Sequence, residues 1–202
     1  MASARWLIHP DYAQLAEVSG SLKAPWRLEE SPFSLCPVDP GSLFFISSLY
    51  DELLPFFSSR LMNAGCDETF DLGHGRSKAA CSQHGTGQVY LNYLLSIYHD
   101  LKKRGFTMQF WGDIVLRYPD LIPQLPKDLI ALDWGYEADY PFETQAAQFT
   151  TAEIPYYVCP GTSSWCSIAG RTEIALGNLT NAAQSELKKR CNRILDHRLG
   201  DS

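Results

Sequence analysis

Short apolar runs alternate with longer segments of helical periodicity along most of this chain, and this alternation restricts the possible folds more than any other feature. Four runs predict strands, at 60–66, 106–113, 128–137 and 154–161. Helical patterns flank them at 39–57, 87–104, 142–151 and 171–189, with a Pro-bounded helical or turn segment up to residue 126. Strands that alternate with helices form right-handed βαβ units around a parallel sheet. The sequence therefore predicts an α/β fold.

The helical patterns at 39–57 and 87–104 each have one apolar face, which we expect to be buried. In the first pattern the apolar residues are Phe45, Leu49, Leu53 and Phe56. In the second they are Val89, Tyr90, Tyr93, Leu94, Ile97 and Leu101, and Gly105 supplies a helix stop. The segment between the first strand and the second helix, with glycines at 73, 75, 85 and 87, is predicted to be a loop.

The 202 residues are 45% hydrophobic and carry a net charge of −6, which is typical of a soluble globular protein with a core. The length fits one domain over 1–202, with residues 1–38 as a loop region before the first full helix, but not a complete eight-stranded α/β barrel. An acidic chain without a Lys/Arg cluster argues against a nucleic-acid partner. Neither a signal peptide nor an apolar run of about 18 residues occurs, so we expect no membrane span and a cytoplasmic location.

Polar and aromatic residues follow each predicted strand, as Asp67-Glu68, Trp111-Gly112-Asp113, Trp134-Gly135-Tyr136-Glu137 and Gly161-Thr162-Ser163-Ser164-Trp165. The carboxyl ends of parallel strands meet at one edge of the sheet, where α/β proteins place their ligand sites. Three tryptophans at successive strand ends fit the walls of one pocket, because an indole offers a flat apolar face to a sugar ring. Paired carboxylates beside such a pocket suggest glycoside chemistry.

Asp67 and Glu68 are adjacent, although like charges at close range raise each other's pKa. Neighbouring side chains on a straight strand point to opposite faces, so the two carboxylates reach one pocket only if the backbone bends directly after the strand. Gly65 permits such a bend, and we therefore expect one there.

The segment Asn63-Ala64-Gly65-Cys66-Asp67-Glu68 resembles the acidic motif His/Asn-x-Gly-x-Asp-Glu of the catalytic domain of glycoside hydrolase family 20, the β-N-acetylhexosaminidases. The continuation Thr69-Phe70-Asp71-Leu72-Gly73 and the later WGD, WGYE and GTSSW segments extend the resemblance to about residue 183, and are most similar to the hexosaminidase D-like branch. The resemblance implies hydrolysis of terminal N-acetylhexosamine residues in glycans or glycoconjugates. It implies no metal and no cofactor.

The resemblance also assigns roles to residues. Glu68 would protonate the leaving oxygen and later activate water, while Asp67 would orient the acetamido group of the substrate, whose oxygen replaces an enzyme nucleophile. The negative charge of Asp67 would raise the pKa of Glu68 and keep a proton on it near neutral pH. The substrate-binding residues implied are Asn63, Trp111, Asp113, Trp134, Glu137 and Trp165.

By the same resemblance the chain corresponds to a partial TIM barrel, roughly strands four to seven with their helices. The family's first three strands have no counterpart, and residues 193–202 diverge from the expected eighth strand, ends that a shifted reading frame or a split gene would produce. Four strands do not close a barrel. We therefore expect self-association through the open barrel edges, and weak or no activity from this chain in isolation.

Other functions remain as alternatives. An inactive barrel remnant or a carbohydrate-binding protein would share the same fold. A zinc module is suggested by Cys66, His74, Cys81 and His84, which lie within nineteen residues. The glycine-rich stretches lack the pattern of a nucleotide-binding loop, and Ser163-Ser164 lacks the Gly-x-Ser-x-Gly turn of serine hydrolases.

Overall fold

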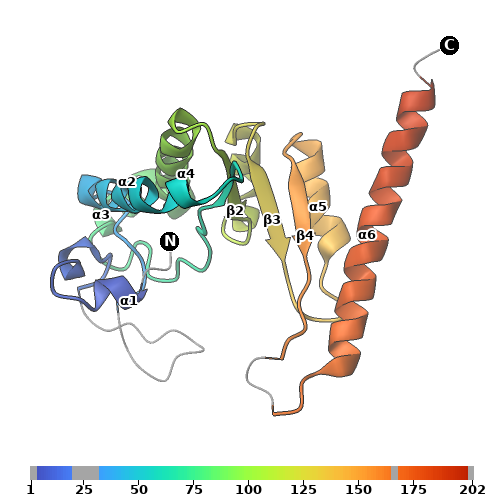
Figure 1. Ribbon diagram of the computed structural model, residues 1–202, viewed down its shortest axis with the longest axis horizontal. Helices are drawn as coiled ribbons and strands as arrows, with labels where there is room; N and C mark the ends of the chain where they lie inside the picture. The colour runs from blue at the N-terminus through green and yellow to red at the C-terminus, as the bar shows by residue number, and fades with distance from the viewer. Residues whose placement is uncertain (1–3, 20–31, 165–167, 200–202) are drawn as a thin grey trace.

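The chain folds around a four-stranded parallel sheet in the computed structural model, which describes residues 4–19, 32–164 and 168–199. The strands are β1 (Leu61–Asn63), β2 (Thr107–Trp111), β3 (Ile130–Trp134) and β4 (Tyr156–Cys159), and they lie in this order across the sheet. Helices connect successive strands, as Figure 1 shows. The α/β class and the four strand positions predicted from the sequence are therefore confirmed.

The α-helices of the described chain are α1 (Ala4–Leu7), α2 (Pro40–Leu53), α3 (Lys78–His84), α4 (Thr86–Lys103), α5 (Phe142–Thr151) and α6 (Thr172–Leu199). Short 3₁₀ helices are η1 (Ala13–Leu15), η2 (Leu54–Phe56), η3 (Val115–Arg117) and η4 (Pro119–Gln124). Within the described ranges, no helix is both long and apolar enough to cross a membrane.

One face of the sheet is covered by helices. The helix α4 contacts β2, and α5 contacts β3 and β4, while α6 lies beyond β4 at the end of the sheet (Figure 1). Met108, Phe110 and Ala131 point to this covered face and are almost fully buried. The apolar face of α4 that the sequence predicted is also buried, so α4 and the sheet share the main core.

The opposite face of the sheet is partly open. Side chains alternate along a strand, so Leu61 on β1 and Tyr157 on β4 project to the side away from Met108. Leu61 is 47% exposed and Tyr157 is 50% exposed. In a closed barrel this face would be the interior, so the exposure of these two side chains is what a partial barrel predicts.

Three details differ from the sequence-based predictions. The strand β1 ends at Asn63 rather than at residue 66, because Gly65 and Cys66 have positive φ angles that strand geometry excludes. Residues 78–84, predicted as loop, form α3. The apolar face predicted for 39–57 is covered only in part, since Leu53 at the end of α2 is 43% exposed and Phe56 in η2 is 84% exposed. Both residues precede the edge strand β1.

Candidate active site

The segment 64–68, hereafter the acid loop, leaves β1 through a sharp bend. Gly65, Cys66 and Glu68 have φ angles of 74°, 75° and 52°. This left-handed region is natural for glycine, but it costs about 1–2 kcal/mol for other residues. Two of the three residues therefore hold a strained conformation, which is common at functional sites. The bend expected from the sequence lies where the adjacent carboxylates need it.

Hydrogen bonds from three directions hold the acid loop. Asn63 Oδ1 accepts the N–H of Gly65 at 2.9 Å, and the carbonyl of Gly65 accepts the N–H of Trp111 at 2.9 Å. The hydroxyl of Tyr90, on α4, donates to the carbonyl of Cys66 at 2.8 Å. These bonds satisfy backbone groups that the strand ladder no longer reaches, and they stabilise the bend.

Asp113 joins the acid loop from the end of β2, since its Oδ2 accepts the N–H of Glu68 at 3.2 Å. Burial raises the pKa of Glu68, and the charges of Asp67 and then Asp113 raise it further, whereas Arg117 lowers it. Burial also raises the pKa of Asp113; the N–H of Glu68 opposes that effect, and the charge of Asp67 adds to it. The sequence suggested the adjacent charge as the cause, but burial contributes more. The three carboxylates form one cluster.

Two aromatic rings stand beside this cluster. Trp134 and Tyr136 lie with ring centroids 5.2 Å apart and planes tilted by 38°. Burial raises the pKa of Tyr136, and the charges of Glu68, Cys159 and Asp67 follow as smaller causes. The Trp134 indole lowers the pKa of Asp113, as a nearby N–H donor does, although the two side chains do not form a hydrogen bond of good geometry. Trp134 Nε1 and Asp113 Oδ1 are thus buried without a hydrogen-bond partner among the described residues.

The sheet register brings further predicted residues to the same side. Asn63 pairs with Gln109 on β2, two residues before Trp111, and Trp111 pairs with Leu132 on β3, two residues before Trp134. Paired residues of parallel strands point to the same face, as do residues two apart. Asn63, Trp111 and Trp134 therefore share the open face of the sheet at its carboxyl end.

A hollow of about 260 Å³ opens beside the end of β1, between that strand and α2. Asn63 and Asp67 line it together with apolar side chains of α2, among them Phe45, Leu49 and Tyr50. One of the two adjacent acids therefore borders a cavity on the open edge of the sheet.

Two predicted substrate-binding residues have other surroundings. Glu137 forms a bidentate ion pair with Arg171, with both N···O distances at 3.0 Å, and both side chains are partly exposed. Trp165 lies outside the described residues. A contact of either residue with a sugar stays a prediction.

Sequence reasoning assigned no role to Glu17, which supports the loop that follows the acid loop. Its carboxylate is fully buried and accepts the N–H of Gly75 at 3.1 Å and the hydroxyl of Ser77 at 2.7 Å. A Cβ at Gly75 would lie 1.9 Å from the carbonyl oxygen of Glu17, so only glycine fits there. The glycine at position 75 was the one signal of this contact in the sequence, and a glycine does not indicate which residue lies against it.

The zinc module proposed as an alternative is not supported. Among the described residues, which include all four candidate ligands, no group of three or more His, Cys, Asp or Glu side chains converges as a metal site would require. The thiol of Cys66 lies 3.7 Å from the carbonyl oxygen of Ala64, and that of Cys81 lies 3.7 Å from the hydroxyl of Ser77.

Comparison with protein families places the chain clearly. The family described as glycosyl hydrolase family 20, catalytic domain, matches residues 2–169. A comparison with curated proteins found no match.

Solved structures share the fold at low sequence identity. A β-N-acetylhexosaminidase from Bacteroides fragilis superposes with a TM-score of 0.60 at 16% identity over 82% of this chain and 32% of its own. A chitobiase from Flavobacterium johnsoniae gives a TM-score of 0.61 at 15% identity, over 80% of this chain and 25% of its own. An exo-β-N-acetylglucosaminidase from Vibrio harveyi, solved with N-acetylglucosamine, gives a TM-score of 0.53 at 18% identity, over 74% of this chain and 22% of its own. The chain thus spans about a third or less of each structure.

Proposed function

The chain belongs to glycosyl hydrolase family 20, and on this premise we propose that it acts on terminal N-acetylhexosamine residues of glycans, by substrate-assisted hydrolysis with retention. The observation that carries the proposal is the cluster of Asp67, Glu68 and Asp113 beside the Trp134–Tyr136 ring pair. Paired carboxylates next to an aromatic surface are what glycoside cleavage needs, since one group moves a proton and the rings bind the sugar face.

Glu68 is the proton donor in this proposal. Its pKa is raised by burial and by two neighbouring carboxylates, so it keeps a proton at a higher pH than an exposed glutamate does. In the first step the proton passes to the leaving oxygen as the glycosidic bond breaks, and the acetamido oxygen of the substrate bonds to the anomeric carbon. In the second step Glu68 takes a proton from water, whose oxygen bonds to the anomeric carbon as the bond between that carbon and the acetamido oxygen breaks.

Asp67 stabilises the intermediate. As an ionised carboxylate it accepts the acetamido N–H of the substrate and balances the positive charge that develops on the oxazolinium ring. The bend of the acid loop, with positive φ at Cys66 and Glu68, supports this pairing of roles, because a straight strand would direct two adjacent acids to opposite faces.

Trp111, Trp134 and Tyr136 form the sugar-binding surface in the proposal. Trp134 Nε1 and Asp113 Oδ1 are buried, and neither has a hydrogen-bond partner among the described residues. A buried polar atom without a partner is destabilising. In this proposal a sugar hydroxyl bonds them only after the two side chains move, one donating and the other accepting.

The two edges of the sheet bear on activity. In the described chain β1 and β4 each pair with a strand on one side only, which leaves backbone groups free for further strands. We expect the 202-residue chain to associate through these edges, and to hydrolyse substrate weakly unless further strands complete the pocket.

Hydrolysis of a chromogenic N-acetylglucosaminide tests the proposal. Replacing Glu68 with Gln should lower the rate by about 100- to 10,000-fold, the contribution of a general acid. Glu52→Gln, at an exposed position on α2, is the matched control and should leave the rate unchanged. A wild-type rate that Glu68→Gln does not alter would contradict the assignment. Binding of N-acetylglucosamine without hydrolysis would favour a carbohydrate-binding protein instead.

A further inference from the structure

Asn178, near the start of α6, links two loops at the carboxyl end of the sheet. Its amide nitrogen donates to the carbonyl oxygens of Gly135 and Glu137, at 3.0 and 2.7 Å. Its Oδ1 accepts the N–H of Gly161 at 3.0 Å. The side chain is fully buried. An asparagine amide has two N–H donors and one acceptor oxygen, so every polar group of this side chain is used.

The first two acceptors belong to residues 135–140, hereafter the wall loop, which follows β3 and carries Tyr136. The third partner, Gly161, belongs to the segment after β4. We propose that Asn178 is a positioning residue that holds the wall loop and the segment 160–164 at a fixed separation, and so sets the place of the Trp134–Tyr136 ring pair beside the acid loop. The inference rests on the proposed function only where it assigns these rings to sugar binding.

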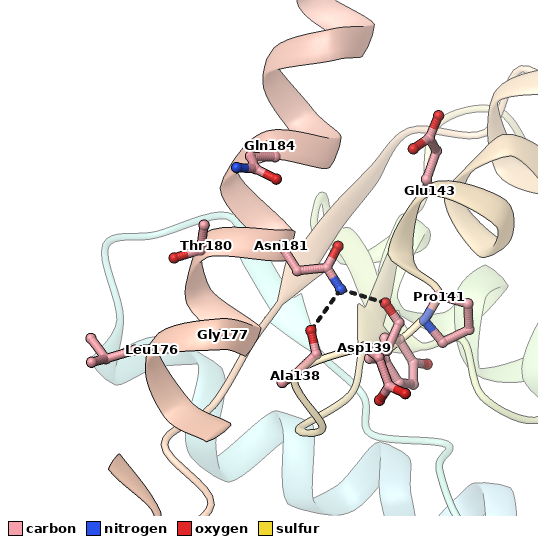
Figure 2. Close-up of a pocket in the computed structure, with 10 residues that line it drawn as sticks. Ala138, Asp139, Pro141, Glu143, Leu176, Gly177, Thr180, Asn181 and Gln184 are labelled. Atoms are coloured by element: carbon pink, nitrogen blue, oxygen red, sulfur yellow. Dashed lines mark hydrogen bonds between the residues drawn. The ribbon is translucent and has the colours of Figure 1, made fainter. Parts of the chain in front are cut away.

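Close backbone contact makes this link possible. A Cβ at Gly177 would lie 2.7 Å from the Cβ of Ala138, so α6 approaches the wall loop as nearly as glycine allows. One turn further along α6, Asn181 donates to the carbonyls of Ala138 and Tyr140, at 3.3 and 2.7 Å. Figure 2 shows the Asn181 amide directed at this loop, beside a hollow of about 630 Å³ between the loop and α6. Two asparagines thus hold four carbonyls of one loop.

The two asparagines hold different parts of the loop. Asn178 bonds the residues on either side of Tyr136, whose pKa responds to the charges of Glu68 and Asp67. Asn181 bonds Ala138 and Tyr140, two and four residues beyond Tyr136. A second link between the two strand ends is the hydroxyl of Ser163, which donates to the carbonyl of Tyr136 at 3.2 Å. Removing the Asn178 amide should therefore displace the rings, whereas removing the Asn181 amide should not.

Fluorine NMR of protein labelled with fluorotryptophan tests this without substrate. The Trp134 resonance is assigned as the one that Trp134→Phe removes. In Asn178→Ala that resonance should shift and broaden, whereas in the matched control Asn181→Ala it should keep its position. Both variants are checked for folding by circular dichroism. Affinity for N-acetylglucosamine should fall about tenfold in Asn178→Ala and should stay within about twofold in Asn181→Ala.

Two results would overturn the inference: a Trp134 resonance that stays in place in folded Asn178→Ala, or one that moves equally in both variants. If Asn178→Ala does not fold, Ser163→Ala breaks the other link between the same segments and should move the resonance in the same sense by less; no movement there overturns the inference. Failure of the wild-type protein to bind or hydrolyse the sugar would count against the proposed function, while the resonance comparison still decides the role of Asn178.

Discussion

The acid loop follows β1 and the wall loop follows β3, and the two loops are held in different ways. The acid loop has three residues at positive φ, and its hydrogen-bond partners lie in β1, β2 and α4 and at Asp113, two residues past β2. The wall loop is held by side chains of α6, which follows some 40 positions later in the chain. The acid loop therefore combines a strained backbone with bonds from several elements, whereas one helix, α6, supplies both asparagines that bond the wall loop.

The two loops also supply different groups: the acid loop carries the carboxylates, and the wall loop carries one ring of the aromatic pair. The acids need a fixed backbone, because a small rotation would return them to opposite faces of the strand. The ring pair needs a fixed distance from the acids, and a helix that docks on the outside of the sheet supplies it. Variants of the two loops should therefore fail in distinguishable ways.

Gly135→Ala should have the largest effect, because the new Cβ would lie 2.1 Å from the ring of Tyr140. That ring has little room to move, since its hydroxyl donates to Gln145 Oε1 at 2.6 Å. We expect the free energy of unfolding to fall by about 1–3 kcal/mol, as for overpacked sites, measured by urea denaturation. The double variant Gly135→Ala with Tyr140→Leu should recover part of the loss. A single variant as stable as the wild type would contradict the geometry of the wall loop.

Gly65→Ala should come next, because φ at this position is 74°. Alanine there should lower the free energy of unfolding by about 1–2 kcal/mol. Gly105→Ala is the control, since φ is 77° and a Cβ would meet nothing within 4 Å. The two variants should lose similar stability in urea denaturation, but only Gly65→Ala should reduce hydrolysis. Equal rates for both would mean that the bend does not serve the acids.

Asp113→Asn should change the fold less, because an asparagine Oδ1 can still accept the N–H of Glu68. It removes a negative charge that raises the pKa of Glu68, so that pKa should fall. Since the proton donor is lost as pH rises through its pKa, the alkaline limb of the rate profile should move to lower pH. Carbon NMR of the Glu68 carboxyl gives the same quantity without substrate. A shift to higher pH would be the opposite of this expectation.

Arg171→Gln should have the smallest effect. Its ion pair with Glu137 is bidentate, but the two side chains are 40% and 58% exposed, and surface pairs of this kind contribute less than about 1 kcal/mol. Thermal unfolding at low and high salt measures the loss, which should shrink as salt screens the charges. A loss above that of Gly65→Ala would show that this pair, rather than Asn178, anchors the wall loop.

Much of the fold followed from periodicity. The strands and α4 and α5 lie where apolar spacing predicted them, because that spacing records which side faces a core. Apolar spacing does not show which other element covers an apolar face. Leu53 and Phe56 were therefore expected to be buried, but they are exposed. The helix α3 was missed because its short, mostly polar sequence lies between glycines and has no buried residue.

The candidate site could also be predicted from the sequence only in part. The acid loop could be predicted because a motif, a glycine and two acids lie within six positions. The contacts of Glu17 and Asn178 could not, because a side chain that bonds a distant backbone leaves no local pattern. Asn178-Leu179-Thr180 even matches a glycosylation triplet, yet its amide nitrogen is buried and already bonded to two carbonyls.

The strand order β1-β2-β3-β4 is also the order in which the strands leave the ribosome during synthesis. Each strand pairs with the next one, one crossover later, so we expect the sheet to extend in the direction of translation. Asp67, Glu68 and Asp113 are all present once residue 113 has emerged, but the asparagine that bonds the residues on either side of Tyr136 is residue 178. A nascent chain released between those two points would contain the three carboxylates without the side chain that bonds the wall loop.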